Sequence, residues 1–319
     1  RYLGGRGLHA YLMLNHTEQG CDPYGPDNVV LLGGGVLCGT AASGTGRCDV
    51  MTKSPLTGLL SSGNMGGFFT PELAHAGFHT VLVKGQAKHP VYIFAHNGEI
   101  EIRDARDIWG MSVTDTQWAI REDIGDGEVQ SAVIGPAGEN KVAYANVMTL
   151  IKNAAGRCGA GGVMGAKNLK AVAARGTMDL KIAHPMDALE FNKRFIDQIA
   201  SAKVNQTQGK LGTPFIWGAT NTWGGIRTRN FQYNQTEYAD EIEPEALDEV
   251  LDDTMGPYHM ASCYGCQVHC RGQYKIPDGP YAGKYDEGPE YTSQGAFCSE
   301  TDTPRMTTLL TANHLVDQY

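Results

Sequence analysis

The sequence lacks several features that mark common classes of protein. No cluster of lysine and arginine occurs among its 319 residues, and the formal net charge is −9. A nucleic-acid surface needs a basic face that neutralises phosphates, so this charge argues against a nucleic-acid partner. The longest uncharged stretch, residues 28–46, is rich in glycine, whereas a membrane span needs about 20 mostly apolar residues. We expect no membrane span.

Familiar nucleotide motifs and targeting signals are missing too. The P-loop pattern is absent, and no glycine-rich segment cleanly matches the dinucleotide-binding fingerprint. No signal peptide is visible. The chain begins with Arg1 rather than methionine and stops at Tyr319 inside an expected helix. We therefore expect it to be a piece of a longer polypeptide.

The cysteines carry the most specific pattern in the chain. Of eight cysteines, three form a C-x2-C-x3-C run at Cys263, Cys266 and Cys270. Thiolates at this spacing reach one metal centre, which would be zinc or an iron–sulfur cluster. Either centre needs a fourth ligand, and no nearby residue supplies an obvious one. A metal site in a reducing cytoplasm explains the cysteines better than disulfides in a secreted protein.

The residue pattern of the sequence changes near residues 176–184. Short runs with β-branched residues or alternation precede this boundary, and Asn97-Gly98 predicts a hairpin. Helices that begin with Pro185 and Pro244 follow it. We predict an α+β fold, with a β-rich cofactor-binding domain over 1–180 and a mainly helical domain over 181–319. Strands are expected at 29–32, 80–84, 91–95, 99–103, 131–134 and 170–174, with helices at 70–76, 113–123, 185–203 and 306–319.

Three glycine-rich segments stand out in the first half, at 39–47, 61–67 and 153–168. Glycine lets the backbone approach a ligand and direct its amides at anionic oxygens. Arg47 and Arg157 lie within two of these segments and offer bidentate partners for phosphate. The pattern indicates a large phosphorylated cofactor in a fold other than a standard nucleotide-binding one.

Taken in order, a series of motifs resembles the aldehyde:ferredoxin oxidoreductase family of tungsten-pterin enzymes. The similarity runs through nearly the whole chain, and motifs of this length and order are highly specific. They are LGGRGL at 3–8, KSPLTG at 53–58, and the segments at 64–77, 83–88, 134–140, 154–157, 163–171, 227–231 and 288–291.

The resemblance implies a first domain whose two sheets form a base under a bis-pyranopterin that carries tungsten or molybdenum. Mainly helical second and third domains would follow, the third being absent here. The resemblance also implies a [4Fe-4S] cluster held by Cys263, Cys266 and Cys270 plus a distant cysteine. A Mg2+ ion would bridge the cofactor phosphates.

Individual positions match the motifs of the family. Arg47 matches an arginine that pairs with pterin phosphate, while Asn64 and Ala154 match positions whose carbonyls hold the Mg2+ ion. Asn153 stands where many relatives carry arginine. Glu290 matches the region that places a glutamate near the metal, and Glu287 is close enough in sequence to serve. Further cofactor-lining positions are Gly66, Gly67, Gly156 and Arg157.

The implied function is anaerobic oxidation of an aldehyde to a carboxylic acid. Electrons would leave through the cluster to ferredoxin or to an iron–sulfur partner subunit, in a homodimer or a hetero-oligomer. Two alternatives stay open. One is the tungsten subunit of a benzoyl-CoA-reductase-type complex, although such relatives have a cysteine ligand in the region of Glu287 and Glu290. The other is a non-enzymatic zinc or electron-transfer module, which would leave the glycine-rich segments unexplained.

Overall fold

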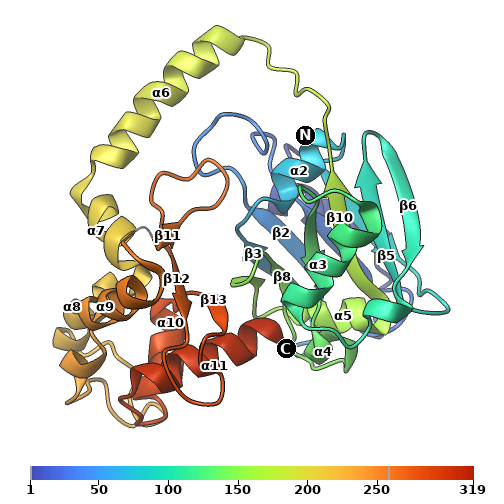
Figure 1. Cartoon of the computed structure of the whole chain (residues 1–319). Coiled ribbons are helices and arrows are strands. Elements are labelled where there is room, and N and C mark those ends of the chain that lie inside the picture. The colour runs from blue at the N-terminus through green and yellow to red at the C-terminus, as the bar shows by residue number, and fades with distance from the viewer. Residues whose placement is uncertain (1, 258) are drawn as a thin grey trace. The chain divides into compact units, whose positions relative to one another are not determined.

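Two β-sheets form the body of the N-terminal part of the chain (Figure 1). The computed structural model describes residues 2–257 and 259–319. The chain divides into two units, and each is described by itself. Unit 1 runs to Asn192 and includes Cys263–Gly265 and Gln318–Tyr319, whereas unit 2 comprises Lys193–Ser262 and Cys266–Asp317.

The first sheet of unit 1 is antiparallel, in the order β3-β2-β1-β4. The second sheet has the order β6-β5-β10-β7-β8-β9, and only the β10–β5 pair in it is parallel. β3 and β9 are thus edge strands, and they pack against each other. The strands are β1 (Val29–Gly33), β2 (Cys48–Lys53), β3 (Leu60–Met65), β4 (Thr80–Lys84), β5 (Val91–His96), β6 (Glu99–Asp104), β7 (Gln130–Val133), β8 (Val147–Thr149), β9 (Asn153–Ala155) and β10 (Leu169–Arg175).

Apolar side chains fill three layers in unit 1. Val30 and Val50 of the first sheet share a core with Val172 of the second sheet. The other face of the first sheet packs on Met13 of α1. The other face of the second sheet packs on Ile120 of α3. The helices of unit 1 are α1 (Gly5–His16), α2 (Phe69–His75), α3 (Val113–Ile124), α4 (Pro136–Glu139) and α5 (Ala160–Ala166), with a 3-10 turn at Arg106–Ile108.

Unit 2 is mainly helical and carries a small antiparallel sheet, β11-β12-β13. Its core includes the fully buried Trp217 and Tyr274. Its elements are α7 (Lys203–Leu211), α8 (Trp217–Thr222), α9 (Pro244–Met255), β11 (Met260–Ala261), β12 (Arg271–Lys275), β13 (Tyr285–Glu287), α10 (Tyr291–Gln294), a π-helical turn (Gly295–Ser299), α11 (Met306–Gln318), and 3-10 turns at Thr213–Ile216 and Ala239–Ile242. The division between the units falls within α6 (Pro185–Ser201).

The predicted α+β class is confirmed, with two sheets followed by helices. All six expected strands form, and Asn97 and Gly98 turn the β5–β6 hairpin with φ of 43° and 88°. Among the described residues, sequence patterns missed seven strands: β2, β3, β8 and β9 of unit 1, and β11, β12 and β13 of unit 2. None of the described helices is long and apolar enough to cross a bilayer.

One buried ion pair joins β10 of the second sheet to α4, and the same lysine also binds the loop before α3. The Lys170 Nζ atom of β10 donates to Glu139 Oε1 and, at 3.0 Å, to the Met111 carbonyl oxygen. The Lys170 and Glu139 side chains are 0% and 6% exposed. Removing one partner of a buried pair leaves an uncompensated charge, which typically costs about 3–5 kcal/mol.

Lys170→Met should therefore lower the free energy of unfolding in urea by about 3–5 kcal/mol. The double variant K170M/E139L should recover much of this loss, because neither charge is left alone. Arg106→Ala is the matched control: its pair with Asp104 is exposed, so a change below about 1 kcal/mol is expected. Equal losses in K170M and R106A would contradict the assignment.

Candidate functional site

The edge strands β3 and β9 approach each other closely at Gly63, which has no side chain. An ideal Cβ on Gly63 of β3 would lie 2.9 Å from the carbonyl carbon of Ala155 and 3.0 Å from the Sγ of Cys158. No side chain larger than hydrogen fits there without a shift of the neighbouring strand. The second and third glycine-rich segments are thus brought together at this point.

Gly66 lies one residue beyond β3, where three predicted site residues meet. An ideal Cβ on it would lie 2.6 Å from Cys263 Sγ, 3.1 Å from Asn153 Oδ1 and 3.5 Å from Arg47 Nη1. Cys263 belongs to unit 1 with the other three residues. The structure therefore brings the first cysteine of the motif to two glycine-rich segments.

Backbone and side-chain hydrogen bonds hold Cys263 in this place. The Tyr264 amide donates to the Gly67 carbonyl (3.2 Å), and the Gly44 amide donates to the Gly265 carbonyl (3.1 Å). The Tyr264 hydroxyl donates to the Gly39 carbonyl (2.8 Å). These bonds connect 263–265 to the first two glycine-rich segments, so all three segments converge around Cys263.

A cavity of about 400 Å³ is lined by Arg6, Arg47, Asp49, Asn64 and three glycines. Of the predicted cofactor-binding residues, Arg47 and Asn64 line it. Arg47 Nε donates to Asn64 Oδ1, and Arg47 Nη2 donates to the Asn64 carbonyl at 3.3 Å. Both arginine side chains are exposed. An anion in this cavity would meet two guanidinium groups.

Neighbouring side chains contact the carboxylate of Asp49, which lines the cavity. Its Oδ2 lies 2.7 Å from Nδ1 of the fully buried His9, and its Oδ1 accepts from the Ser62 hydroxyl at 2.5 Å. His9 Nε2 lies 3.1 Å from Thr80 Oγ1. Asp49 Oδ1 also lies 3.9 Å from Arg6 Nε. The carboxylate that lines the cavity is therefore engaged by His9, Ser62 and Arg6.

The third glycine-rich segment splits into two parts with different roles. Gly156 and the exposed Arg157, whose φ is 66°, directly follow β9 and Ala154. Beyond them, α5 is wholly buried, and an ideal Cβ on Gly161 or Gly165 would lie 2.3 or 2.0 Å from a neighbouring carbonyl oxygen. These glycines permit close packing of a helix, so the phosphate-binding interpretation applies only to 153–157.

The other two cysteines of the motif lie in unit 2. Cys266 and Cys270 are half-buried in the loop between β11 and β12. Among residues 2–257 and 259–319, no three His, Cys, Asp or Glu side chains are grouped as around a metal ion. The ligand set Cys263, Cys266 and Cys270 remains a prediction from their spacing.

Four further cysteines are packing groups. Cys38, Cys48, Cys158 and Cys298 are buried, and burial raises the pKa of each thiol. For Cys298 the pKa reaches about 12. Cys298 packs with Trp217 and Leu309 in the core of unit 2.

The two candidate catalytic glutamates differ in their surroundings, and both lie in unit 2. Glu287 ends β13, is 4% exposed, and pairs with the buried Arg271 (Nε–Oε1 3.3 Å). Glu290 precedes α10, is half-buried, and accepts a hydrogen bond from the Thr213 hydroxyl. Glu290 is the better candidate for proton transfer, because Glu287 is held in a buried ion pair.

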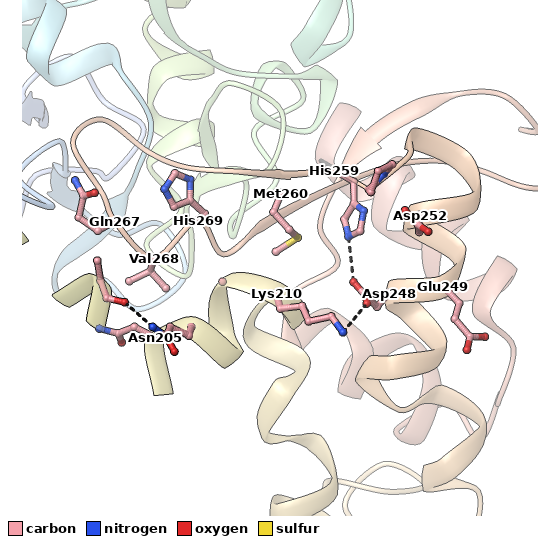
Figure 2. A pocket seen from close by; sticks show the side chains of 14 residues that line it. Asn205, Lys210, Asp248, Glu249, Asp252, His259, Met260, Gln267, Val268 and His269 are labelled. Carbon is pink, nitrogen blue, oxygen red and sulfur yellow. Dashed lines mark hydrogen bonds and ion pairs between the residues drawn. The ribbon is translucent and has the colours of Figure 1, made fainter. Parts of the chain in front are cut away.

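A second cavity, of about 750 Å³, lies in unit 2 between α7, α9 and the segment after α9 (Figure 2). His259 and Lys210 both point at Asp248, with Nε2–Oδ1 and Nζ–Oδ2 distances of 3.1 and 3.7 Å. His259 Nδ1 also lies 3.0 Å from the Gly256 carbonyl. Asp248 of α9 is thus engaged by Lys210 of α7 and by His259.

Comparison with known proteins decides the family. The family model described as "Aldehyde ferredoxin oxidoreductase, N-terminal domain" matches residues 1–176, and that described as "Aldehyde ferredoxin oxidoreductase, domains 2 & 3" matches residues 190–319. The chain belongs to this family. The resemblance predicted from the motif series is therefore confirmed.

Relatives include the tungsten-containing aldehyde ferredoxin oxidoreductase of Pyrococcus abyssi, 38% identical over 325 residues, with 100% of this chain and 51% of the relative covered. The aliphatic sulfonate oxidoreductase, WOR-like subunit, of Pyrococcus furiosus is 29% identical over 334 residues, with coverage of 100% and 52%. This chain thus spans about half the length of these curated relatives.

A solved structure shares the fold. It is the active site complex BamBC of benzoyl coenzyme A reductase in complex with 1,5 dienoyl-CoA. The TM-score is 0.83 at 28% identity, with 99% of this chain and 48% of that chain covered. The family fold is therefore present in this portion of the protein.

Sequence reasoning missed the residues that support the site. Arg6 of the LGGRGL motif lines the cavity, and Tyr264 of the cysteine motif binds the Gly39 carbonyl. The motifs alone predicted neither role. His9 and Asp49 gave no signal, because they are 40 positions apart and meet only when α1 packs on the first sheet.

Gly66→Ala tests the convergence at Cys263. The new Cβ would meet Cys263 Sγ at 2.6 Å, so the sulfur must move outward. In metal-free protein we expect Cys263 to react severalfold faster with iodoacetamide, as followed by peptide mass spectrometry. Gly7→Ala is the control, because open space surrounds that position. An unchanged rate at Cys263 in G66A would show that the sulfur lies elsewhere.

Proposed function

We propose that the protein is a tungsten-dependent oxidoreductase that converts aldehydes to carboxylic acids. Electrons pass through a [4Fe-4S] cluster to ferredoxin or to an iron–sulfur partner subunit. Family membership over both halves of the chain supports this proposal. The observation that carries it is the meeting of Cys263 with the glycine-rich segments at Gly66.

The residues of unit 1 fit a phosphorylated pterin. Arg47, with Arg6 beside it, would hold phosphate in the 400 Å³ cavity, while the backbone at Gly66, Gly67, Gly156 and Arg157 would line the rest. The fit rests on two exposed guanidinium groups and on Gly5 and Gly35 of the cavity, which leave open space where a Cβ would stand. Molybdenum could replace tungsten in the same cradle.

A Mg2+ ion between the cofactor phosphates would take the carbonyl oxygens of Asn64 and Ala154. The Asn64 carbonyl accepts a 3.3 Å hydrogen bond from Arg47. A hard cation prefers such oxygens, so Arg47 would turn from this carbonyl towards phosphate when the ion binds.

Cys263, Cys266 and Cys270 would supply three thiolates to the cluster, and the fourth ligand would lie outside the chain. When bound, the cofactor and cluster supply the redox chemistry that protein side chains lack. Oxidation of an aldehyde consumes one water and releases two electrons and two protons. The carboxylate of Glu290 would accept one of these protons, oriented by the Thr213 hydroxyl.

A reductive role is the second candidate, because the solved structure with the same fold is part of a benzoyl coenzyme A reductase. Glu287 and Glu290 stand in this chain where such relatives place a cysteine ligand, and this favours aldehyde oxidation. Assays with viologen dye, aldehydes and aryl-CoA thioesters separate the two. Reduction of aryl-CoA without aldehyde oxidation would reverse our choice.

Glu290→Gln should lower kcat for aldehyde oxidation by about 10²–10⁴-fold, the usual contribution of a general base. The KM should change less, and the cluster spectrum should persist. Glu245→Gln is the control, because Glu245 is an exposed glutamate of α9. Unchanged turnover in E290Q would remove this residue from the mechanism.

Metal analysis tests the proposal as a whole. The intact protein, purified without oxygen, should contain tungsten or molybdenum and about four irons per chain, with the broad visible absorption of an iron–sulfur cluster. Zinc in place of iron, with neither heavy metal present, would instead support a zinc-binding module and end the proposal.

A further inference from the structure

The side-chain amide of Asn153 is mismatched to its surroundings. Its Oδ1 lies 3.8 Å from Cys263 Sγ, in the position to accept from a thiol. Its Nδ2 is buried and has no hydrogen-bond partner. An unsatisfied buried donor costs about 1–3 kcal/mol, so it calls for an explanation.

The position of the amide is tightly fixed. Asn153 pairs with Thr149 at the start of the β8–β9 hairpin. On its other side, Oδ1 lies 3.1 Å from the place of an ideal Gly66 Cβ. The side chain thus lies between a strand and the Gly66 backbone, and it cannot swing far from Cys263.

Ligation of iron by the Cys263 sulfur would reverse the preference of this contact. A protonated thiol donates to Oδ1, but a thiolate that ligates iron can only accept. Two acceptors would then face each other. A half-turn of the amide exchanges oxygen and nitrogen with little change of shape, so the buried N–H group then points at the sulfur.

We propose that Asn153 donates an N–H···S hydrogen bond to the Cys263 thiolate and thereby raises the reduction potential of the iron–sulfur cluster. The inference rests on the proposed function, which makes Cys263 a cluster ligand. A donor to sulfur withdraws negative charge and stabilises the reduced, more negative cluster. Asn153 is then a positioning and tuning residue rather than the phosphate contact that its place in a glycine-rich segment predicts.

The test uses the intact protein, purified without oxygen, and two variants. Asn153→Leu removes both the donor and the acceptor. Asn153→Asp keeps the shape, removes the N–H donor and adds a negative charge, both of which lower the potential. A potential that does not fall in N153D would therefore overturn the hydrogen bond even if N153L folds poorly. Asn140→Leu deletes an amide of unit 1 that bonds only its own helix, at Pro136, and serves as the control.

Potentiometric titration followed by electron paramagnetic resonance measures the cluster directly. We expect iron content close to wild type and a midpoint potential that falls in N153L and N153D but not in N140L. A tenfold change in the equilibrium constant for reduction corresponds to 59 mV for a one-electron couple. After exchange into deuterated water, the reduced wild-type cluster should show a coupled deuteron that N153L lacks.

The outcomes separate this inference from the proposed function. A wild-type protein without an iron–sulfur cluster would defeat the proposed function itself. An intact cluster whose potential and deuteron coupling match wild type in both Asn153 variants would overturn only the hydrogen bond. Loss of pterin with an unchanged potential would also overturn it, and would return Asn153 to the phosphate site.

Discussion

The close approach of the Cys263 sulfur to the backbone of Gly66 is the contact on which the site depends. The 2.6 Å between this sulfur and an ideal Cβ leaves no room for any side chain. Because the same glycine adjoins Asn153 and Arg47, one missing side chain lets a thiol, an amide and a guanidinium meet. The hydrogen bonds of Tyr264 and Gly265 to the glycine-rich segments then hold the sulfur in place.

Buried charged side chains of unit 1 have partners close by. Asp49 would oppose an anion, but His9 and Ser62 take up its carboxylate, and Arg47 is left to face the cavity. Elsewhere, Lys170 is buried and depends on Glu139 alone for a counter-charge. The buried thiols carry no charge, because burial raises the pKa of each of them. Cys298 packs with Trp217 and Leu309 in the core of unit 2.

Much of the fold could be predicted from local sequence. The residues that hold the site in place could not. The strand at 91–95 and its hairpin partner have β-branched residues around an Asn-Gly turn, and these signals are local. β3 and β9 contain no β-branched or aromatic residue, so their pairing depends on the strands beside them. The cysteines and Arg47 were found because their motifs are contiguous. The His9–Asp49 pair was not, because it arises only when α1 packs on β2.

The placement of β3 and β9 at the ends of their sheets has a consequence for handling the protein. An edge strand presents main-chain groups that can pair with another molecule. Here β3 and β9 pack against each other, so each shields part of the other's edge from further copies of the chain. Parting these two strands would therefore expose edges with which other copies can pair.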